Sequence, residues 1–219
     1  MFFARKRGGF TLIELLVVVS ILALLIGILM PSLRGARRGA KRTVCASNLR
    51  GIGQAMRAYL NDNRDILPVV ASLPSIPMFD PPRPRIADTL RPYLEKDVAA
   101  EAGEVKVFQC PADVPGFDNR PAPNTGRSFF QTEGSSYRFN VELYWLMRDT
   151  SAPDPWKTLK PTTLYNLVRD PRMAEYYRGQ PSEEQIHLLR DYQPFHGSKG
   201  STQPINFLYV DGHVSDLER

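Results

Sequence analysis

The sequence has few of the residues, and none of the short motifs, by which enzymes and compact metal sites are usually recognised. Only two cysteines and three histidines occur in 219 residues. No C-x-x-C pair is present, so nothing favours a zinc knuckle or a thioredoxin-like site. The sequence also lacks a G-x-S-x-G elbow, a P-loop, a G-x-G-x-x-G turn and an H-E-x-x-H pair. We therefore expect that the chain is not an enzyme.

Acidic residues are the minority among the charges. There are 28 Lys and Arg against 23 Asp and Glu, which gives a net charge of +5 and a pI of about 9.3. A basic balance suits nucleic acid or an anionic membrane surface. Much of the excess lies in residues 5–7 and 34–42, on either side of one long apolar run. Lipid headgroups are therefore the simpler partner, and we do not expect nucleic acid to bind.

That run, Phe10 to Met30, is almost free of charge and has about the 20 residues that a helix needs to cross a bilayer. Its exception is Glu14. An ionised carboxylate in hydrocarbon costs roughly 3 kcal/mol on insertion scales, so such residues usually have a partner. Cleavage between Gly9 and Phe10 would free an α-amine, which could neutralise Glu14 of a neighbouring copy. The alternative is a signal anchor with one tolerated polar residue near its cytoplasmic end.

No convincing A-x-A site follows the apolar run, so ordinary signal-peptide removal is not expected. Because both flanks are basic, the positive-inside rule does not decide which end stays in the cytoplasm. Charge alone thus leaves the orientation open.

The segment Gly9-Phe10-Thr11-Leu12-Ile13-Glu14-Leu15-Leu16-Val17-Val18 resembles the cleavage and methylation segment of type IV prepilins and type II secretion pseudopilins. The resemblance implies that a prepilin peptidase cuts after Gly9 and N-methylates Phe10. It implies that Glu14 fixes the register between subunits, and that Pro31 is the helix-kinking proline of the family.

The resemblance also implies a location and partners. Residues 1–9 would lie in the cytoplasm, and the rest would form a single-pass protein of the cytoplasmic membrane with its globular part outside. The expected partners are the prepilin peptidase, copies of the chain or related pilins, an inner-membrane assembly platform and the lipid bilayer.

Three regions follow from the pattern: a leader at 1–9, an N-terminal helix at 10–62 and a globular domain at 63–219. Between Leu33 and Leu60 apolar residues recur at spacings of three to five, which predicts one apolar face of an amphipathic helix. Pro31 should bend this helix without ending it. Residues 61–63 (Asn-Asp-Asn) form a stop signal.

Cys45 and Cys110 are the two cysteines. Outside the cytoplasm such a pair usually forms a disulfide, which here would tie the helix to the globular domain. The alternative is two buried free thiols.

The globular domain is predicted to consist of short helices and strands between proline-rich loops. A short helix broken near Pro92 is expected within Ile86 to Asp97. Strands are expected at Val105 to Phe108, Ser135 to Asn140, Leu164 to Val168, Met173 to Tyr177 and Ile205 to Val210, whereas Val141 to Met147 and Ile186 to Leu189 are ambiguous.

The last of these strands leads into Asp211-Gly212, which predicts a hairpin with a type I′ turn. We expect an α+β, pilin-like fold, in which a small antiparallel sheet lies on the apolar face of the long helix.

The C-terminal region has one candidate ligand site. His196-Gly197 and Asp211-Gly212-His213 resemble the C-terminal segment of a pilin-like family in which a His precedes Asp-Gly, although the gap here is longer. His196, Asp211 and His213 could hold a metal. Alternatively, Asp211-Gly212 is turn chemistry and His196 is a hydrogen-bonded packing residue.

Major pseudopilins carry a structural calcium in their C-terminal loops, for which Asp113, Asp118 and Asp211 are candidate ligands. No D-x-D-x-D run is present, so no cofactor is expected.

Two functions remain open. The first is a structural subunit that is trimmed after Gly9 and polymerises through its N-terminal helix. The second is a monomeric, signal-anchored, extracytoplasmic ligand- or metal-binding protein whose N-terminus only resembles a prepilin.

Overall fold

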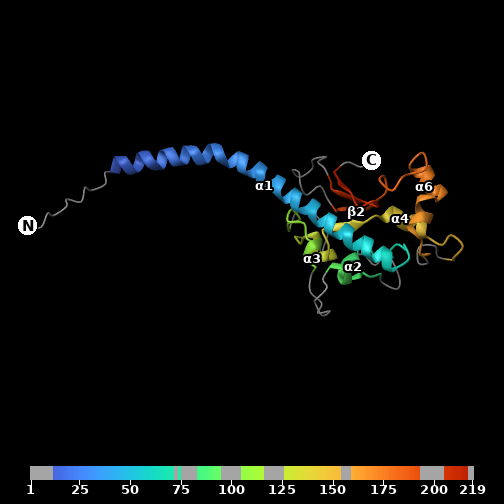
Figure 1. Cartoon of the computed structure of the whole chain (residues 1–219). Helices are drawn as coiled ribbons and strands as arrows, with labels where there is room; N and C mark the ends of the chain where they lie inside the picture. The colour runs from blue at the N-terminus through green and yellow to red at the C-terminus, as the bar shows by residue number, and fades with distance from the viewer. Residues whose placement is uncertain are drawn as a thin grey trace, which may run out of the picture. The chain divides into compact units, whose positions relative to one another are not determined.

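The computed structural model describes residues 12–71, 74, 83–94, 105–115, 126–153, 159–192 and 205–216. The chain divides into two compact units, residues 1–40 and 41–219. Helix α1 (Leu12–Asp62) contributes to both, and every other helix and strand belongs to the second unit (Figure 1). A long apolar helix together with a small antiparallel sheet confirms the predicted α+β, pilin-like fold class.

Helix α1 is 51 residues long and contains Pro31 without interruption. A proline removes one backbone hydrogen bond but does not have to end a helix, as the sequence predicted. The helix ends where the Asn-Asp-Asn signal was found. There the backbone N–H of Asn63 donates to the carbonyls of Tyr59 and Leu60, and Arg64 and Asp65 take positive φ angles.

One face of α1 is buried, but over a shorter stretch than the pattern predicted. Burial begins at Cys45, whereas Leu33 and Val44 are 53% and 47% exposed. The apolar repeat continues back to Leu33, yet its side chains are buried only from Cys45 onward. The buried positions on α1 are Cys45, Leu49, Ile52, Gly53, Ala55, Met56 and Leu60.

The sheet is antiparallel, with the strand order β1-β2-β3-β4. Its strands are β1 (Tyr137–Phe139), β2 (His187–Asp191), β3 (Phe207–Tyr209) and β4 (Val214–Ser215), and the β2–β3 register shifts between His187 and Leu189.

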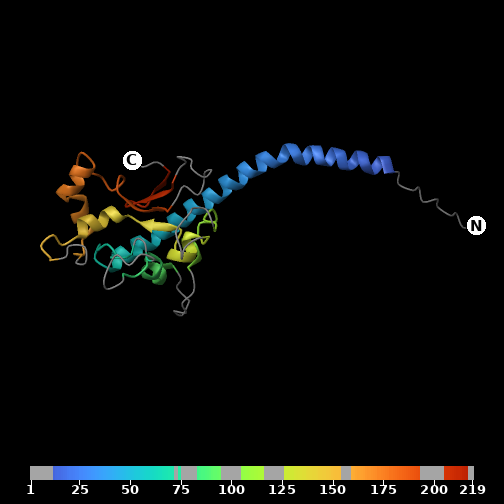
Figure 2. The same cartoon turned by 180° about the vertical axis from the view of Figure 1, so that it is seen from behind.

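Helix α1 touches the sheet closely at Gly53, where an added Cβ would lie 2.8 Å from Cδ1 of Leu208. Seen from behind, α2 (Ile86–Leu94) lies on the other side of α1 from the strands, and Tyr59 meets Tyr93 there, edge to face (Figure 2).

The β3–β4 hairpin forms as predicted, but its turn is not type I′. The N–H of Gly212 donates to the carbonyl of Tyr209, and the N–H of Tyr209 donates to the carbonyl of His213. Gly212 has a φ of 84°, whereas Asp211 is not among the residues with positive φ. This is a three-residue loop ending in a left-handed glycine, the next most common hairpin connection after the two-residue turns.

Two predicted strands are helices instead. α5 (Leu164–Val168) begins at Thr163, whose side chain accepts a hydrogen bond from the N–H of Asn166. α6 (Pro171–Tyr176) begins at Asp170, with proline in its first turn. Thr and Asp are preferred N-caps, and proline suits the first helical turn, so Thr163 and Asp170-Pro171 begin helices.

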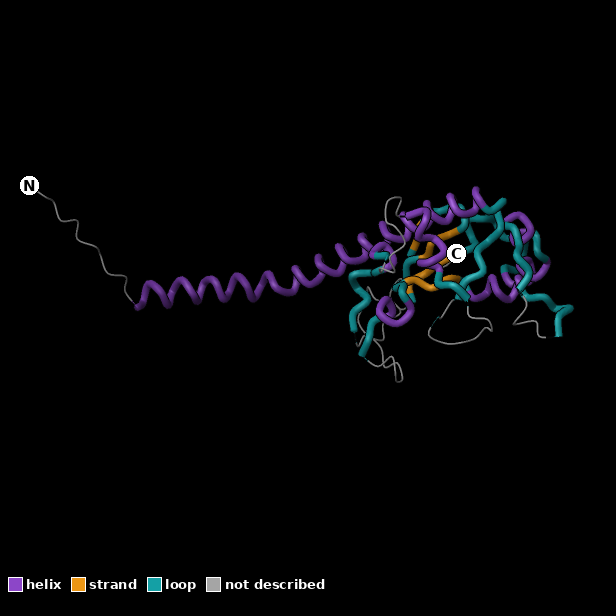
Figure 3. The backbone as a smooth tube through the Cα atoms, turned by 90° about the horizontal axis from the view of Figure 1, so that it is seen from below, coloured by secondary structure: helices purple, strands orange, loops and turns teal. Residues whose placement is uncertain are grey.

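The remaining elements are short. The predicted strand at Val105 to Phe108 is a 3₁₀ turn, η1 (Lys106–Phe108), and the ambiguous segment after β1 is helix α4 (Val141–Met147). Helix α3 (Phe129–Glu133) follows its cap Ser128. Pro92 lies inside α2 rather than breaking it. Loops and short helices therefore make up most of the described chain outside α1 (Figure 3).

His187 makes the second unit sensitive to acid. Its ring is buried against Phe207 and Tyr209, and burial, with Arg190 and Arg138 nearby, lowers its pKa from 6.5 to about 4. The unfolded chain therefore binds a proton that the folded chain does not, so stability is full above pH 6.5 and falls as the pH drops toward 4.

We expect His187 to lower the free energy of unfolding by about 2–3 kcal/mol between pH 7.5 and pH 4.5. Urea unfolding of the full chain in detergent at the two pH values measures the loss. His187→Leu serves as the comparison, because it cannot titrate and should show a shallower dependence. Equal slopes for the two proteins would contradict a buried neutral histidine.

Candidate functional site

The first unit presents an unusually large apolar surface. The large hydrophobic side chains from Leu12 to Met30 are between 48% and 79% exposed. This part of α1 is long and apolar enough to cross a membrane, and none of it is buried within the protein. Exposed apolar patches of this extent mark a membrane or partner interface.

The uncharged polar side chains in and next to this surface are satisfied by the helix itself. The hydroxyl of Ser20 donates to the carbonyl of Leu16 at 2.8 Å, and that of Ser32 donates to the carbonyl of Leu29 at 2.8 Å. In hydrocarbon such internal bonds are required, because no water is available. Glu14 is the acidic residue of the first turn and is exposed.

Several predicted site residues lie outside the described part of the chain. These are Gly9 and Phe10 at the expected cleavage site, and His196 and Asp118 among the candidate ligands. The structure therefore places Glu14 but not the amine proposed to meet it.

Asp211 and His213, two of the candidate ligands, lie close together at the β3–β4 turn. Nδ1 of His213 is 2.6 Å from Oδ1 of Asp211, which also accepts the backbone N–H of His213 at 3.0 Å. The imidazole stacks on Tyr209 with ring centroids 4.2 Å apart. Among the described residues no three His, Cys, Asp or Glu side chains form a metal cluster. The Asp211 carboxylate is thus bonded to His213 within its own turn.

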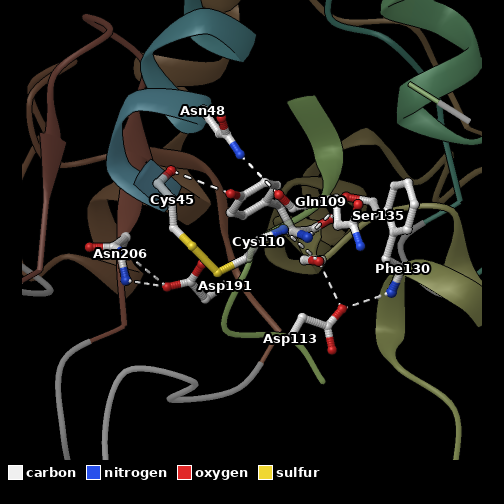
Figure 4. Close-up of a disulfide and its surroundings, with 11 residues drawn as sticks. Cys45, Asn48, Gln109, Cys110, Asp113, Phe130, Ser135, Asp191 and Asn206 are labelled. Atoms are coloured by element: carbon white, nitrogen blue, oxygen red, sulfur yellow. Dashed lines mark hydrogen bonds between the residues drawn. A yellow bond between two sulfur atoms is a disulfide. The ribbon is translucent and has the colours of Figure 1, made fainter. Parts of the chain in front are cut away.

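Asp113, a calcium candidate from the sequence, is buried and bonded to its own chain (Figure 4). Its carboxylate accepts the backbone N–H groups of Phe129 at 3.0 Å and Phe130 at 2.8 Å, and the hydroxyl of Ser136 at 2.7 Å. Ser136 in turn accepts the N–H of Cys110. The acid therefore caps α3 and joins it to the disulfide segment and to the start of β1.

Replacing Asp113 with alanine should lower the free energy of unfolding by about 2–4 kcal/mol, because two buried N–H groups lose a charged acceptor. Chemical denaturation of the full chain in detergent measures this loss. Asp113→Asn is the matched control, since it keeps one acceptor oxygen and should lose less. A calcium-dependent rise in melting temperature that Asp113→Ala removes would instead identify Asp113 as a calcium ligand.

The two cysteines form the predicted disulfide. Cys45 and Cys110 are both fully buried, and their Cα atoms are 5.1 Å apart (Figure 4). The hydroxyl of Tyr137 in β1 contacts the carbonyl of Cys45 at 3.4 Å, and burial raises the pKa of this phenol. The bridge thus joins the first buried position of α1 to the buried segment that follows η1.

Sequence reasoning missed the polar contacts that hold the rest of the second unit. Oδ2 of Asp191, at the end of β2, accepts both the backbone N–H and the side-chain amide of Asn206. Arg42 forms an ion pair with Asp216 just after β4. Their sequence separations, 15 and 174 residues, left no local signal by which to find them.

Fold and surface together give an α+β protein whose N-terminal helix is long and apolar enough to cross a membrane. The prokaryotic N-terminal methylation motif matches residues 4–30. The chain is 37% identical over 78 residues to the type IV wide pilus major component PilA4 of Thermus thermophilus, an alignment that covers 36% of this chain and 60% of that protein.

It is also 39% identical over 59 residues to the type II secretion system core protein G of Pseudomonas aeruginosa, covering 27% of this chain and 42% of that protein. Less than two thirds of either relative is thus covered, and no solved structure matches. The N-terminal part of the chain is thus similar to pilins and pseudopilins, and these findings support a pilin-type structural role.

Proposed function

We propose that the chain is a structural subunit that is made as a membrane-held precursor and then polymerises into a type IV pilus or a type II secretion pseudopilus. Residues 1–9 are the leader, 10–62 form the assembling helix and 63–219 coat the outside of the fibre. The observation that carries the proposal is the exposed apolar surface of α1 on a chain with the N-terminal methylation motif.

Polymerisation follows from what must cover that surface. In the precursor the bilayer covers it, and outside the bilayer only other apolar helices can. Burying one large aliphatic side chain stabilises an assembly by about 1.5–3 kcal/mol. The side chains from Leu12 to Met30 supply many such contacts, and the exposed Leu33 adds another.

Glu14 fixes the register between neighbouring subunits. A prepilin peptidase cuts after Gly9 and methylates the new amino terminus of Phe10, which remains a cation. That cation neutralises Glu14 of the adjacent subunit, because a paired charge in a medium of low dielectric constant costs much less than two separate ones. The role of the chain is assembly, with no catalytic step of its own.

The partners follow from this sequence of events. They are the prepilin peptidase, the cytoplasmic membrane that holds the precursor, an inner-membrane assembly platform and other copies of this chain or related pilins. One of the two relatives is a pilus component and the other a secretion-system core protein, which supports both kinds of fibre.

Intact-mass measurement of the membrane form tests the proposal. The mature chain should lack Met1 to Gly9 and carry one added methyl group. Electron microscopy of sheared surface material, with an antibody against residues 63–219, should label fibres. A mature chain that still begins at Met1 and never appears in fibres would indicate the signal-anchored monomeric binding protein instead.

A further inference from the structure

A cationic face follows the apolar run on the same helix. Arg34, Arg37 and Arg38 lie in α1 at the i, i+3 and i+4 spacing that places side chains on one face. Lys41 continues the same spacing in the sequence. Between Glu14 and Asp62 the sequence has no acidic residue, so the helix carries no negative charge beside these cations.

These three arginines are not used to hold the protein together. All three are exposed, and none takes part in the ion pairs found among the described residues. The one contact recorded for them is a long approach of Arg34 to the sulfur of Met30, at 3.9 Å. Arg42, by contrast, pairs with Asp216. The three arginines nearest the apolar run are thus exposed and outside these ion pairs.

In a bilayer these arginines would lie at the depth of the lipid headgroups. At about 1.5 Å per residue, Arg34 lies roughly 6 Å and Arg38 roughly 12 Å beyond Met30. A bilayer has about 5–8 Å of headgroup region on each side of its hydrocarbon core. With the apolar run across the core, the long arginine side chains reach the phosphates without leaving the helix.

We propose that Arg34, Arg37 and Arg38 form a binding site for the headgroup phosphates of anionic phospholipids. Guanidinium groups bind phosphate oxygens bidentately and remain charged at any physiological pH. A lipid surface fits better than nucleic acid because the site begins about one helical turn beyond the membrane-length run. The inference requires only that residues 12–30 cross the membrane, so it holds whether or not the chain is processed or polymerises.

The site gives the unassembled subunit a preferred lipid environment. Each basic residue near an anionic surface attracts it, and the attraction weakens as salt rises. We therefore expect phosphatidylglycerol to be enriched over phosphatidylcholine around the helix by roughly fivefold. This is the enrichment that the attraction of about one basic residue would produce. The enrichment should fall toward one at high ionic strength.

Electron paramagnetic resonance of spin-labelled lipids measures this enrichment directly. The full chain is reconstituted into phosphatidylcholine vesicles containing trace spin-labelled phosphatidylglycerol or phosphatidylcholine. Because Arg5, Lys6 and Arg7 also attract anionic lipid, all measurements use a background in which these three are glutamine. The test variant adds Arg34→Gln, Arg37→Gln and Arg38→Gln, and the matched control adds Arg50→Gln, Arg64→Gln and Arg178→Gln.

The background and control proteins should show the same preference for phosphatidylglycerol, and the test variant should show none. Equal preference in the test and control variants would overturn the proposal, because net charge alone would then attract the lipid. A second result would also overturn the proposal. In it, the background protein shows no lipid preference but binds duplex DNA, and the test variant does not bind DNA. That result would assign the site to nucleic acid. Neither result depends on cleavage after Gly9 or on fibre formation.

Discussion

Replacing Glu14 with alanine is expected to abolish fibre formation while leaving removal of residues 1–9 intact. The amine of Phe10 would then enter an apolar environment without its counter-charge. The penalty is roughly 3 kcal/mol, or about a 100-fold loss in the association constant of each contact. Because a fibre repeats the contact in every subunit, the loss is compounded along its length. Sedimentation of sheared fibres, with intact mass of the membrane form, measures both effects.

Ser20→Ala is the matched control for this experiment. It also removes a polar group from the apolar part of α1, but the hydroxyl of Ser20 bonds only to the carbonyl of Leu16 in its own helix. Its fibres should form at the normal level. Normal fibre yield from Glu14→Ala would refute the pairing, and failure of that variant to lose its leader would make Glu14 a determinant of cleavage.

Removing the disulfide by a double Cys45→Ser and Cys110→Ser substitution should destabilise the second unit by about 4 kcal/mol. The bridge closes a loop with a sequence separation of 65 residues, and loop closure on this scale lowers the entropy of the unfolded chain by that amount. Domains of this size have total stabilities of about 5–15 kcal/mol, so a large share is lost. Guanidinium unfolding of the full chain in detergent, followed by tryptophan fluorescence, measures the change.

Reductant provides the control for the disulfide experiment. A thiol reductant added during unfolding should lower the midpoint of the wild-type chain to that of the double variant, and it should not move the variant itself. Because both cysteines are fully buried, reduction should require unfolding first. A wild-type midpoint that matches the double variant without reductant would contradict a stabilising bridge.

The long helix, the disulfide and the β3–β4 hairpin were predictable because each has a strong signal. An uninterrupted apolar run, two cysteines in a chain expected outside the cytoplasm, and Asp-Gly between alternating runs each allow few alternatives. The type of hairpin turn was not predictable, because Asp-Gly serves two-residue and three-residue loops alike and only the backbone angles separate them.

Helices α5 and α6 were predicted as strands because five-residue apolar segments suit either element. Their caps, Thr163 and Asp170-Pro171, were the better evidence, since a capping side chain satisfies backbone N–H groups that a strand would pair elsewhere. Local chemistry at the start of a short segment was thus more informative than its hydrophobicity.

The extent of burial along α1 and the role of Asp113 could not be read from the sequence. Leu33 and Leu60 belong to the same apolar repeat, and only tertiary packing shows that one is exposed and the other buried. Asp113 was a candidate calcium ligand because a carboxylate suits either a metal or a helix cap. The groups that donate hydrogen bonds to its carboxylate lie 16 to 23 residues further along the chain.

The bridge between Cys45 and Cys110 has a mechanical consequence. Tension applied along α1 reaches Cys45, the first buried position of the helix, and passes through the sulfur atoms directly to Cys110. Residues 46–109 are thereby bypassed and cannot be drawn out while the bond is intact. A pulled subunit extends only through the chain that follows Cys110, so a single-molecule stretching trace should lengthen by the contour of the bypassed segment after reduction.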